Sequence, residues 1–108
     1  MTVNQLAQKY SFKSICLPCK EREVKGGYCG DLLSWVMGHA TSDNVWITIM
    51  SNVNVLAVAS LTDVACIILA EGVEPDDEVI KTAIDKDINI LSSELGAFEI
   101  SVLIGNDI

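Results

Sequence analysis

The run Val64-Ala65-Cys66-Ile67-Ile68-Leu69-Ala70 is continuously apolar and carries no charge. A strand that helices cover on both faces of a parallel sheet has this composition. Extended back to Val55, the apolar stretch is interrupted by Ser60, Thr62 and Asp63 and falls short of the roughly 20 residues that span a bilayer. The run therefore predicts the central strand of a mainly parallel sheet, and we expect no transmembrane helix.

The segments around this run alternate between helix and strand patterns. Gly30-Asp31 precedes an apolar stretch that ends near Gly38, so the Asp31 carboxylate is expected to cap a helix there. The remaining predictions are a strand at Asn44–Met50, a helix at Asn54–Leu61, a helix from Glu74 to about Lys86, a strand at Ile88–Leu91 and a helix at Glu94–Ile104. This order implies βαβ crossovers and a mainly parallel sheet in a single α/β domain.

Apolar spacing also predicts which side chains face the core. In the helices it places apolar residues three or four positions apart on one inward face. The residues expected to be buried are Val79, Ala83 and Ile84 in the helix after Glu74, Leu95, Phe98, Val102 and Leu103 in the last helix, and both tryptophans, Trp35 and Trp46. Packing in the core, or against a second copy, is the expected role of the tryptophans.

We expect the first 25 residues to form an irregular N-terminal part of the single domain, and residues 26–108 to form the part that carries the family resemblance described below. Thr2–Tyr10 has a capping residue and helical apolar spacing, which predicts a short helix. Phe12–Leu17 alternates weakly toward a strand that Pro18 stops. A second strand is expected at Glu21–Lys25, ending before two glycines.

The composition fits one self-sufficient acidic domain. The chain has 108 residues, 50% of them hydrophobic, and a chain of this size buries about 65% of its unfolded surface. Its 15 acidic and 7 basic residues give a net charge of −8, which repels nucleic acids and anionic membranes, so neither is an expected partner. The first residues lack a signal-peptide pattern, and we expect a cytoplasmic protein with reduced cysteines.

Several segments follow one another in an order that carries a family resemblance. They are Gly30-Asp31-Leu32-Leu33-Ser34 with Val36-Met37, Val45–Thr48, Asn54–Ala59, Ile88–Leu91 and Ala97-Phe98-Glu99. From about Gly26 to its end, the chain resembles the DRTGG domain family. The resemblance implies a fold similar to the N-terminal domains of HPr kinase/phosphorylase and of the Mur ligases. It also implies a subgroup of short, stand-alone proteins of anaerobic bacteria, some encoded near iron-only hydrogenase genes and often labelled serine kinase.

Two stretches depart from the family pattern. Typical members carry an Asp-Arg pair where this chain has Met50–Asn54, and Thr-Gly-Gly where it has Ala70-Glu71-Gly72. Phosphoryl transfer of the HPr type also needs a glycine-rich loop of the form G-x-x-x-x-G-K-[ST], and no such loop is present. We therefore expect an accessory domain without catalytic residues, and not a kinase.

Ligands of parallel α/β sheets bind at the edge where the strands end. This edge is expected to collect the polar residues Gly30, Asp31, Ser51, Asn52, Asn54, Glu71, Gly72, Ser92 and Ser93. These residues supply neutral hydrogen-bonding groups and carboxylates but no basic side chain to clamp a phosphate, which favours a small polar ligand or a protein surface. The alternative is that they are ordinary caps and turn residues.

The cysteines and the single histidine suggest a second kind of site. Cys16 and Cys19 form a C-x-x-C pair with Cys29 ten residues on, a spacing at which thiolates can share zinc or an iron–sulfur cluster. No fourth ligand completes the pattern, so thiols in loops and in the core are the alternative. His39 follows Gly38 at a helix end, where a favourable contact with the helix dipole accounts for it.

Three functions remain open from the sequence. The first is a non-catalytic regulatory or ligand-sensing module, expected as a homodimer, that binds a small metabolite or a partner protein and needs no cofactor. The second is a metal or redox accessory protein that uses Cys16, Cys19 and Cys29, perhaps linked to an iron–sulfur hydrogenase. The third is a plain interaction scaffold.

Overall fold

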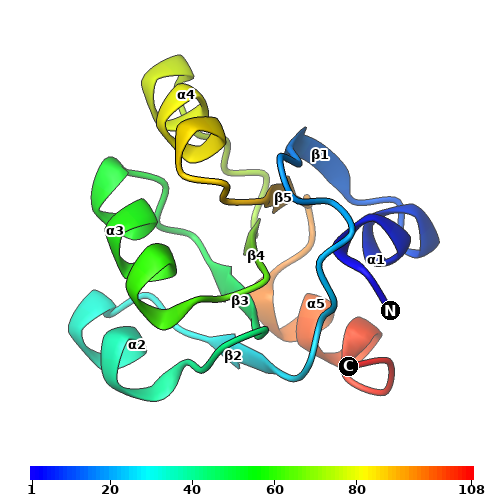
Figure 1. The fold of residues 1–108 in the computed structure, drawn as a ribbon. Helices are drawn as coiled ribbons and strands as arrows, with labels where there is room; N and C mark the ends of the chain where they lie inside the picture. Colours follow the sequence, from blue (N-terminus) through cyan, green and yellow to red (C-terminus); the bar gives the residue numbers. More distant parts are fainter.

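A five-stranded sheet of order β1-β5-β4-β3-β2 runs through the computed structural model, which describes residues 1–108 (Figure 1). Its strands are β1 (Lys13–Cys16), β2 (Gly27–Cys29), β3 (Val45–Thr48), β4 (Cys66–Leu69) and β5 (Ile90–Ser92). Strands β2 to β5 are parallel, and β1 pairs antiparallel with β5. The apolar run predicted as the central strand is β4, whose residues are all buried.

Helices cover both faces of the sheet. They are α1 (Val3–Lys9), α2 (Leu33–His39), α3 (Val53–Thr62), α4 (Asp77–Asp85) and α5 (Ala97–Ile104). Figure 1 shows α2, α3 and α4 on one face, and α1 and α5 on the other. The helices α2, α3 and α4 each connect two neighbouring parallel strands, so the predicted single α/β domain with alternating helices and strands is confirmed.

Each face of the sheet has its own hydrophobic core. One cluster of 15 buried residues packs α2, α3 and α4 against the sheet, and a second cluster of 14 packs α1 and α5 against the other face. Trp46 is fully buried in the first cluster, as predicted, and its indole N–H donates to the carbonyl of Gly30 (3.0 Å). That bond satisfies the one polar group of a side chain that is otherwise apolar.

The N-terminal segment forms two of the three predicted elements. Thr2 and Gln5 form a capping box at the start of α1, and β1 lies within the predicted strand. The strand predicted at Glu21–Lys25 is wrong, because this segment forms only an isolated bridge between Glu23 and Thr2. The strand begins instead at Gly27, where the two glycines were expected to end one.

The inward face predicted for the last helix is wrong. Ile100 and Ile104 are the buried residues of α5, whereas Phe98 is 81% exposed and Val102 is 64% exposed. Leu103 is also exposed, and Leu95 packs against the second cluster from the loop before the helix. Apolar residues surround this helix on nearly every side, so their spacing does not single out the face that meets the sheet.

Two other burial predictions fail on the opposite face of the sheet. Trp35 is 58% exposed, and its ring stacks on that of His39 with 4.4 Å between the ring centroids. In α4, Val79 and Ala83 are buried as predicted, but Ile84 is half exposed. Trp35 and Ile84 therefore lie outside the helix faces that the sheet covers.

Candidate functional site

Asp31 lies at the edge where the parallel strands end, between β2 and α2. Its carboxylate accepts hydrogen bonds from the Thr48 hydroxyl (2.7 Å) and from the Ile49 amide (2.9 Å). The same hydroxyl accepts a bond from the Met50 amide (3.1 Å). The predicted role of Asp31 as a helix cap is therefore wrong: Leu32 occupies the cap position, and Asp31 ties the end of β3 to the loop after β2.

Ser51, Asn52 and Asn54 lie at the start of α3. The Asn52 side chain caps this helix by accepting a hydrogen bond from the Asn54 amide (3.0 Å). Ser51 and Asn52 line a crevice beneath the ends of the strands whose volume is about 10 Å³. That volume holds at most about one water molecule, so this part of the edge has no room for a metabolite.

Glu71 and Gly72 form a strained turn after β4. Both residues have positive φ values, 62° and 72°, in the left-handed region that favours glycine. Their amides donate to the carbonyls of Leu95 (2.9 Å) and Ser93 (2.8 Å), which locks the turn against the loop after β5. A Cβ at Gly72 would lie 2.6 Å from a Glu94 carboxylate oxygen, so a side chain at this position would displace that carboxylate as well as strain the backbone.

This turn borders a polar cavity of about 370 Å³ between β5, the start of β1 and the loop after β4. Three predicted site residues line it, Gly72, Ser92 and Ser93. The other lining residues, which the sequence did not indicate, are Tyr10, Ser11, Lys13, Glu74, Glu94 and Leu95. Lys13 and Glu74, both lining residues, form an ion pair, and the carboxylate of Glu94 has no ionic partner.

The predicted site residues therefore lie in several separate places. Gly30 and Asp31 border a shallow groove of about 340 Å³ along β2 and α2, while Asn54 and Glu71 line no cavity. The added residues of the polar cavity come from the N-terminal segment because β1 pairs antiparallel with β5. Only that pairing places Lys13 opposite Ser92, and no spacing within the sequence indicates it.

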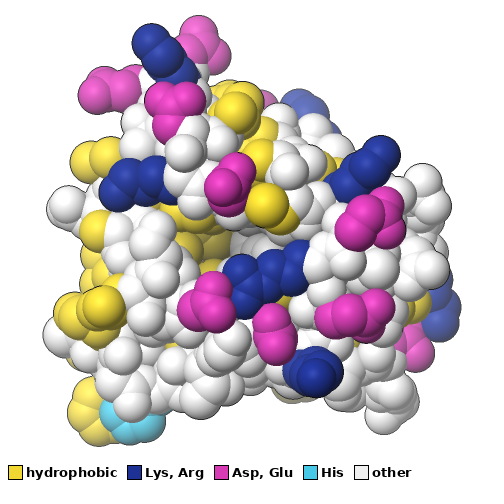
Figure 2. Space-filling view, viewed as in Figure 1, with side chains coloured by type: hydrophobic (Ala, Val, Ile, Leu, Met, Phe, Trp, Pro, Cys, Tyr) yellow, Lys and Arg dark blue, Asp and Glu magenta, His cyan; other side chains and the backbone are white.

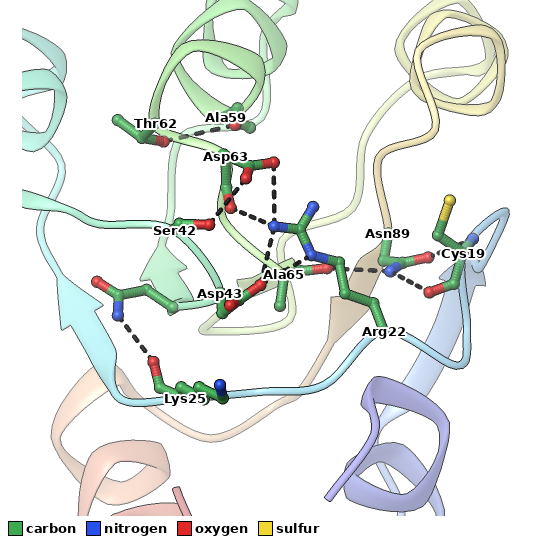
Figure 3. A network of polar contacts seen from close by, with 11 residues as sticks. Cys19, Arg22, Lys25, Ser42, Asp43, Ala59, Thr62, Asp63, Ala65 and Asn89 are labelled. Carbon is green, nitrogen blue, oxygen red and sulfur yellow. Dashed lines mark hydrogen bonds and ion pairs between the residues drawn. The ribbon is translucent and has the colours of Figure 1, made fainter.

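The end of the sheet where the parallel strands begin holds a network centred on Arg22 (Figure 3). Its guanidinium donates to the Asp43 carboxylate (3.1 Å) and to the Asp63 carbonyl (2.6 Å), and it forms an ion pair with the Asp63 carboxylate (3.0 Å). The Ser42 hydroxyl also donates to Asp63 (2.8 Å), and this bond together with Arg22 lowers the pKa of the Asp63 carboxyl. Asp43 and Asp63 precede β3 and β4, so one side chain ties the starts of two strands together.

A buried asparagine completes this edge. Asn89 donates to the carbonyls of Cys19 (2.8 Å) and Ala65 (3.0 Å) and accepts from the Cys19 amide (2.9 Å). A cavity of about 280 Å³ lies beside the network, with Arg22, Asp63 and Lys86 among its lining residues. Figure 2 shows it as a hollow between the helices on the left and the chain that crosses the middle of the view. Because Arg22 is already bound to two carboxylates, it is not free to bind an anionic ligand.

The three cysteines of the predicted metal site are not brought together. Cys16 belongs to β1 and Cys29 to β2, the two opposite edge strands, which are four strand spacings or about 19 Å apart. The chain contains no group of three or more histidine, cysteine or acidic side chains arranged to hold a metal ion. Burial raises the pKa of the Cys16 thiol and, more strongly, that of Cys66, to about 12.

Comparison with known proteins supports the observed architecture. One solved structure is similar over 95% of this chain, with a TM-score of 0.77 and 16% sequence identity: the CBS and DRTGG domains of the regulatory region of Clostridium perfringens pyrophosphatase, complexed with its activator diadenosine tetraphosphate. The present chain spans 45% of that structure's length. No curated protein matches the sequence, and no helix is long and apolar enough to cross a membrane.

The family model of the DRTGG domain matches residues 29–106. The match begins at the end of β2 and continues through α5, so it covers the parallel strands β3 to β5 and the helices α2 to α5. It leaves out α1 and β1, the part that completes the polar cavity and holds the edge of β5. From this match and the shared fold we conclude that the chain belongs to the DRTGG domain family.

Proposed function

We propose that this chain is a non-catalytic regulatory module that senses a small polar metabolite in the cavity beside β5. The observation that carries the proposal is the convergence of Gly72, Ser92 and Ser93 with Lys13, Glu74 and Glu94 around about 370 Å³ of space. Small-molecule sites commonly have about this volume and a few convergent polar groups. The similar pyrophosphatase region is regulatory and binds a nucleotide activator, which supports sensing as the role.

The charges of the cavity favour one class of ligand. Glu74 neutralises Lys13, and Glu94 adds a carboxylate without an ionic partner. Serine hydroxyls supply the remaining hydrogen-bonding groups. This lining attracts an ammonium group or a polyol and repels phosphates, so the proposed ligand is a small amine, amino acid or sugar-like molecule and not a nucleotide.

The proposal has further parts that the sequence suggested. The module acts in the cytoplasm as a homodimer, without a metal ion or other cofactor, and it carries out no chemistry of its own. Ligand binding at the loops after β4 and β5 would be passed to a partner through a change in dimer geometry. The strained turn at Glu71-Gly72 supports this, because it joins the two loops through backbone bonds and borders the cavity.

Thermal unfolding with a panel of compounds tests the proposal. Free amino acids, polyamines and polyols form one arm, and adenine nucleotides with diadenosine tetraphosphate form the other. A compound at about 100 times its Kd adds roughly 2.7 kcal/mol, which raises the Tm of a chain of this size by roughly 10 °C. We expect shifts only in the first arm, and a panel without any shift would contradict the proposal.

A matched pair of variants assigns the shift to the cavity. Glu94→Gln removes the cavity carboxylate that has no ionic partner, and we expect it to abolish most of the shift. Glu21→Gln changes an exposed glutamate that forms no ion pair and should leave the shift unchanged. Equal shifts in both variants would place the ligand elsewhere.

A further inference from the structure

Strand β2 is a free edge of the sheet, opposite the edge that β1 occupies. The carbonyl of Gly26 accepts from the Val45 amide (3.0 Å), and the amide of Gly30 donates to the Ile47 carbonyl (3.1 Å). Because alternate residues of a parallel strand bond to the same neighbour, Gly27 and Cys29 turn their amides and carbonyls away from β3. Such an edge is a template for pairing with another strand.

The flank of this edge on the α2 side is hollow and aromatic. A groove of about 340 Å³ lies there beside Tyr28, Leu32 and Trp35. Tyr28 stacks on His39 with 6.4 Å between ring centroids, and His39 stacks on Trp35. Figure 2 shows the histidine against a hydrophobic side chain at the lower left. Leu32 is 66% exposed, so this flank presents apolar surface that nothing in the chain covers.

The flank of β2 on the α5 side is also hollow. A groove of about 250 Å³ runs between β2 and α5, and Gly27, Cys29, Ser101 and Gly105 are among its lining residues. Phe98 lies one helical turn before Ser101 on the same side of α5 and is largely exposed. The small residues along the groove allow another backbone to approach closely.

We infer that β2 pairs with β2 of a second copy of this chain, antiparallel and with the two-fold axis at Tyr28. In this register Gly27 faces the partner's Cys29 on both sides of the axis, so all the outward amides and carbonyls of the two residues are used. Lys25 then lies opposite the partner's Asp31. Both side chains are exposed and neither forms an ion pair within its own chain. Asp31 accepts from Thr48 and Ile49 through Oδ1 alone, which leaves Oδ2 for the partner's Lys25, so the edge is complementary to itself in charge as well as in hydrogen bonding.

The flanking helices supply the area that the strand lacks. A stable interface buries about 800 Å² on each partner, more than three strand residues provide. Two-fold pairing of β2 would place α2 beside the partner's α2 on one face and α5 beside the partner's α5 on the other. That arrangement covers Leu32, Trp35 and Phe98, which are otherwise exposed. The inference deepens the homodimer of the proposed function and does not depend on ligand binding, because the polar cavity lies at the other edge of the sheet.

Disulfide trapping tests the register directly. Residues opposite each other in a non-hydrogen-bonded antiparallel pair have Cα atoms about 4.5 Å apart, within reach of a disulfide. In a Cys29→Ser background, Tyr28→Cys should give a covalent dimer under mild oxidation. Ser60→Cys, on an exposed position of α3 and outside the proposed interface, is the control and should remain uncrosslinked. Failure of the position-28 variant to cross-link more than this control would overturn the inference.

Light scattering of two matched pairs tests the interface without cysteine chemistry. Cys29→Pro removes an outward amide and keeps the bonds to β3, while Cys29→Ser keeps the amide. Lys25→Glu places a like charge opposite the partner's Asp31, while Lys20→Glu makes the same charge change on an exposed lysine away from the edge. We expect the first member of each pair to be monomeric at concentrations where the second has the mass of two chains. A wild-type monomer, or a dimer that survives both changes, would contradict the proposal, whereas ligand-induced thermal shifts would be unaffected by either result.

Discussion

The thiol of Cys66 lies at the start of β4 and is completely buried, which raises its pKa to about 12. In the unfolded chain the same thiol ionises near pH 8.5. Between these values the unfolded state binds fewer protons than the folded state, so stability must fall as the pH rises.

Replacing Cys66 with alanine should remove this pH dependence. From about pH 9 upward, we expect wild type to lose about 1.4 kcal/mol per pH unit more than Cys66→Ala loses. Urea unfolding of both proteins at pH 8, 9 and 10 measures the difference. Parallel losses of stability would show that Cys66 is ionised in the folded protein.

Replacing Arg22 should destabilise the end of the sheet where β3 and β4 begin. It bridges Asp43 and Asp63 but is partly exposed, so Arg22→Met should lower the unfolding free energy by about 1 to 2 kcal/mol at pH 7. Lys20→Met, which removes an exposed lysine without an ion pair, should change it by less than about 0.5 kcal/mol.

The acid dependence of the Arg22 effect follows from Asp63. The pKa of this carboxyl is lowered in the folded protein, so its contribution is complete above its unfolded pKa of about 4 and is lost as the pH falls below that value. The difference in unfolding free energy between wild type and Arg22→Met should therefore become smaller below about pH 4. If this difference in unfolding free energy stays constant down to pH 2.5, the ion pairs of Arg22 are not its cause.

Among the elements, α5 gives the clearest test of which face packs on the sheet. Ile100 is fully buried and Phe98 is 81% exposed. In dilute, monomeric protein, Ile100→Ala should cost about 2 to 4 kcal/mol, whereas Phe98→Ser should change stability by about 0.5 kcal/mol or less. Chemical unfolding of the two variants checks this, and the reverse order would favour the face that apolar spacing predicted.

The parallel core could be predicted from sequence because its elements carry strong local signals. The uncharged run of β4 and the acidic, proline-led start of α4 each specify their element without reference to the rest of the chain. Strand β2 carries no such signal, because a three-residue strand that begins at a glycine has no periodicity to detect. Its place comes from pairing with β3, which is a tertiary effect.

The candidate site was harder to predict than the fold. The strand-end residues Gly72, Ser92 and Ser93 follow from the topology of parallel sheets, and the structure places all three around one cavity. Lys13 reaches the same cavity only through the antiparallel pairing of β1 with β5. A contact between residues about 80 positions apart leaves no local pattern in a single sequence.

At the scale of the whole molecule, the two free sides of the sheet present different chemistry. The side at β1 and β5 holds a polar cavity lined by an ion pair, and the side at β2 presents unpaired backbone between apolar flanks. The proposed ligand site and the proposed self-association surface therefore lie on opposite sides of one sheet.

The central claim is that a small polar ligand binds beside β5, and amide chemical-shift mapping tests it most directly. The ¹⁵N-labelled chain is titrated with the amino acids, polyamines and polyols of the panel. We predict saturable shifts confined to Gly72, Ser93 and Glu94 and their neighbours, with little change around Arg22. Shifts that cluster at any other surface, or no saturable shift with any compound, would contradict the claim.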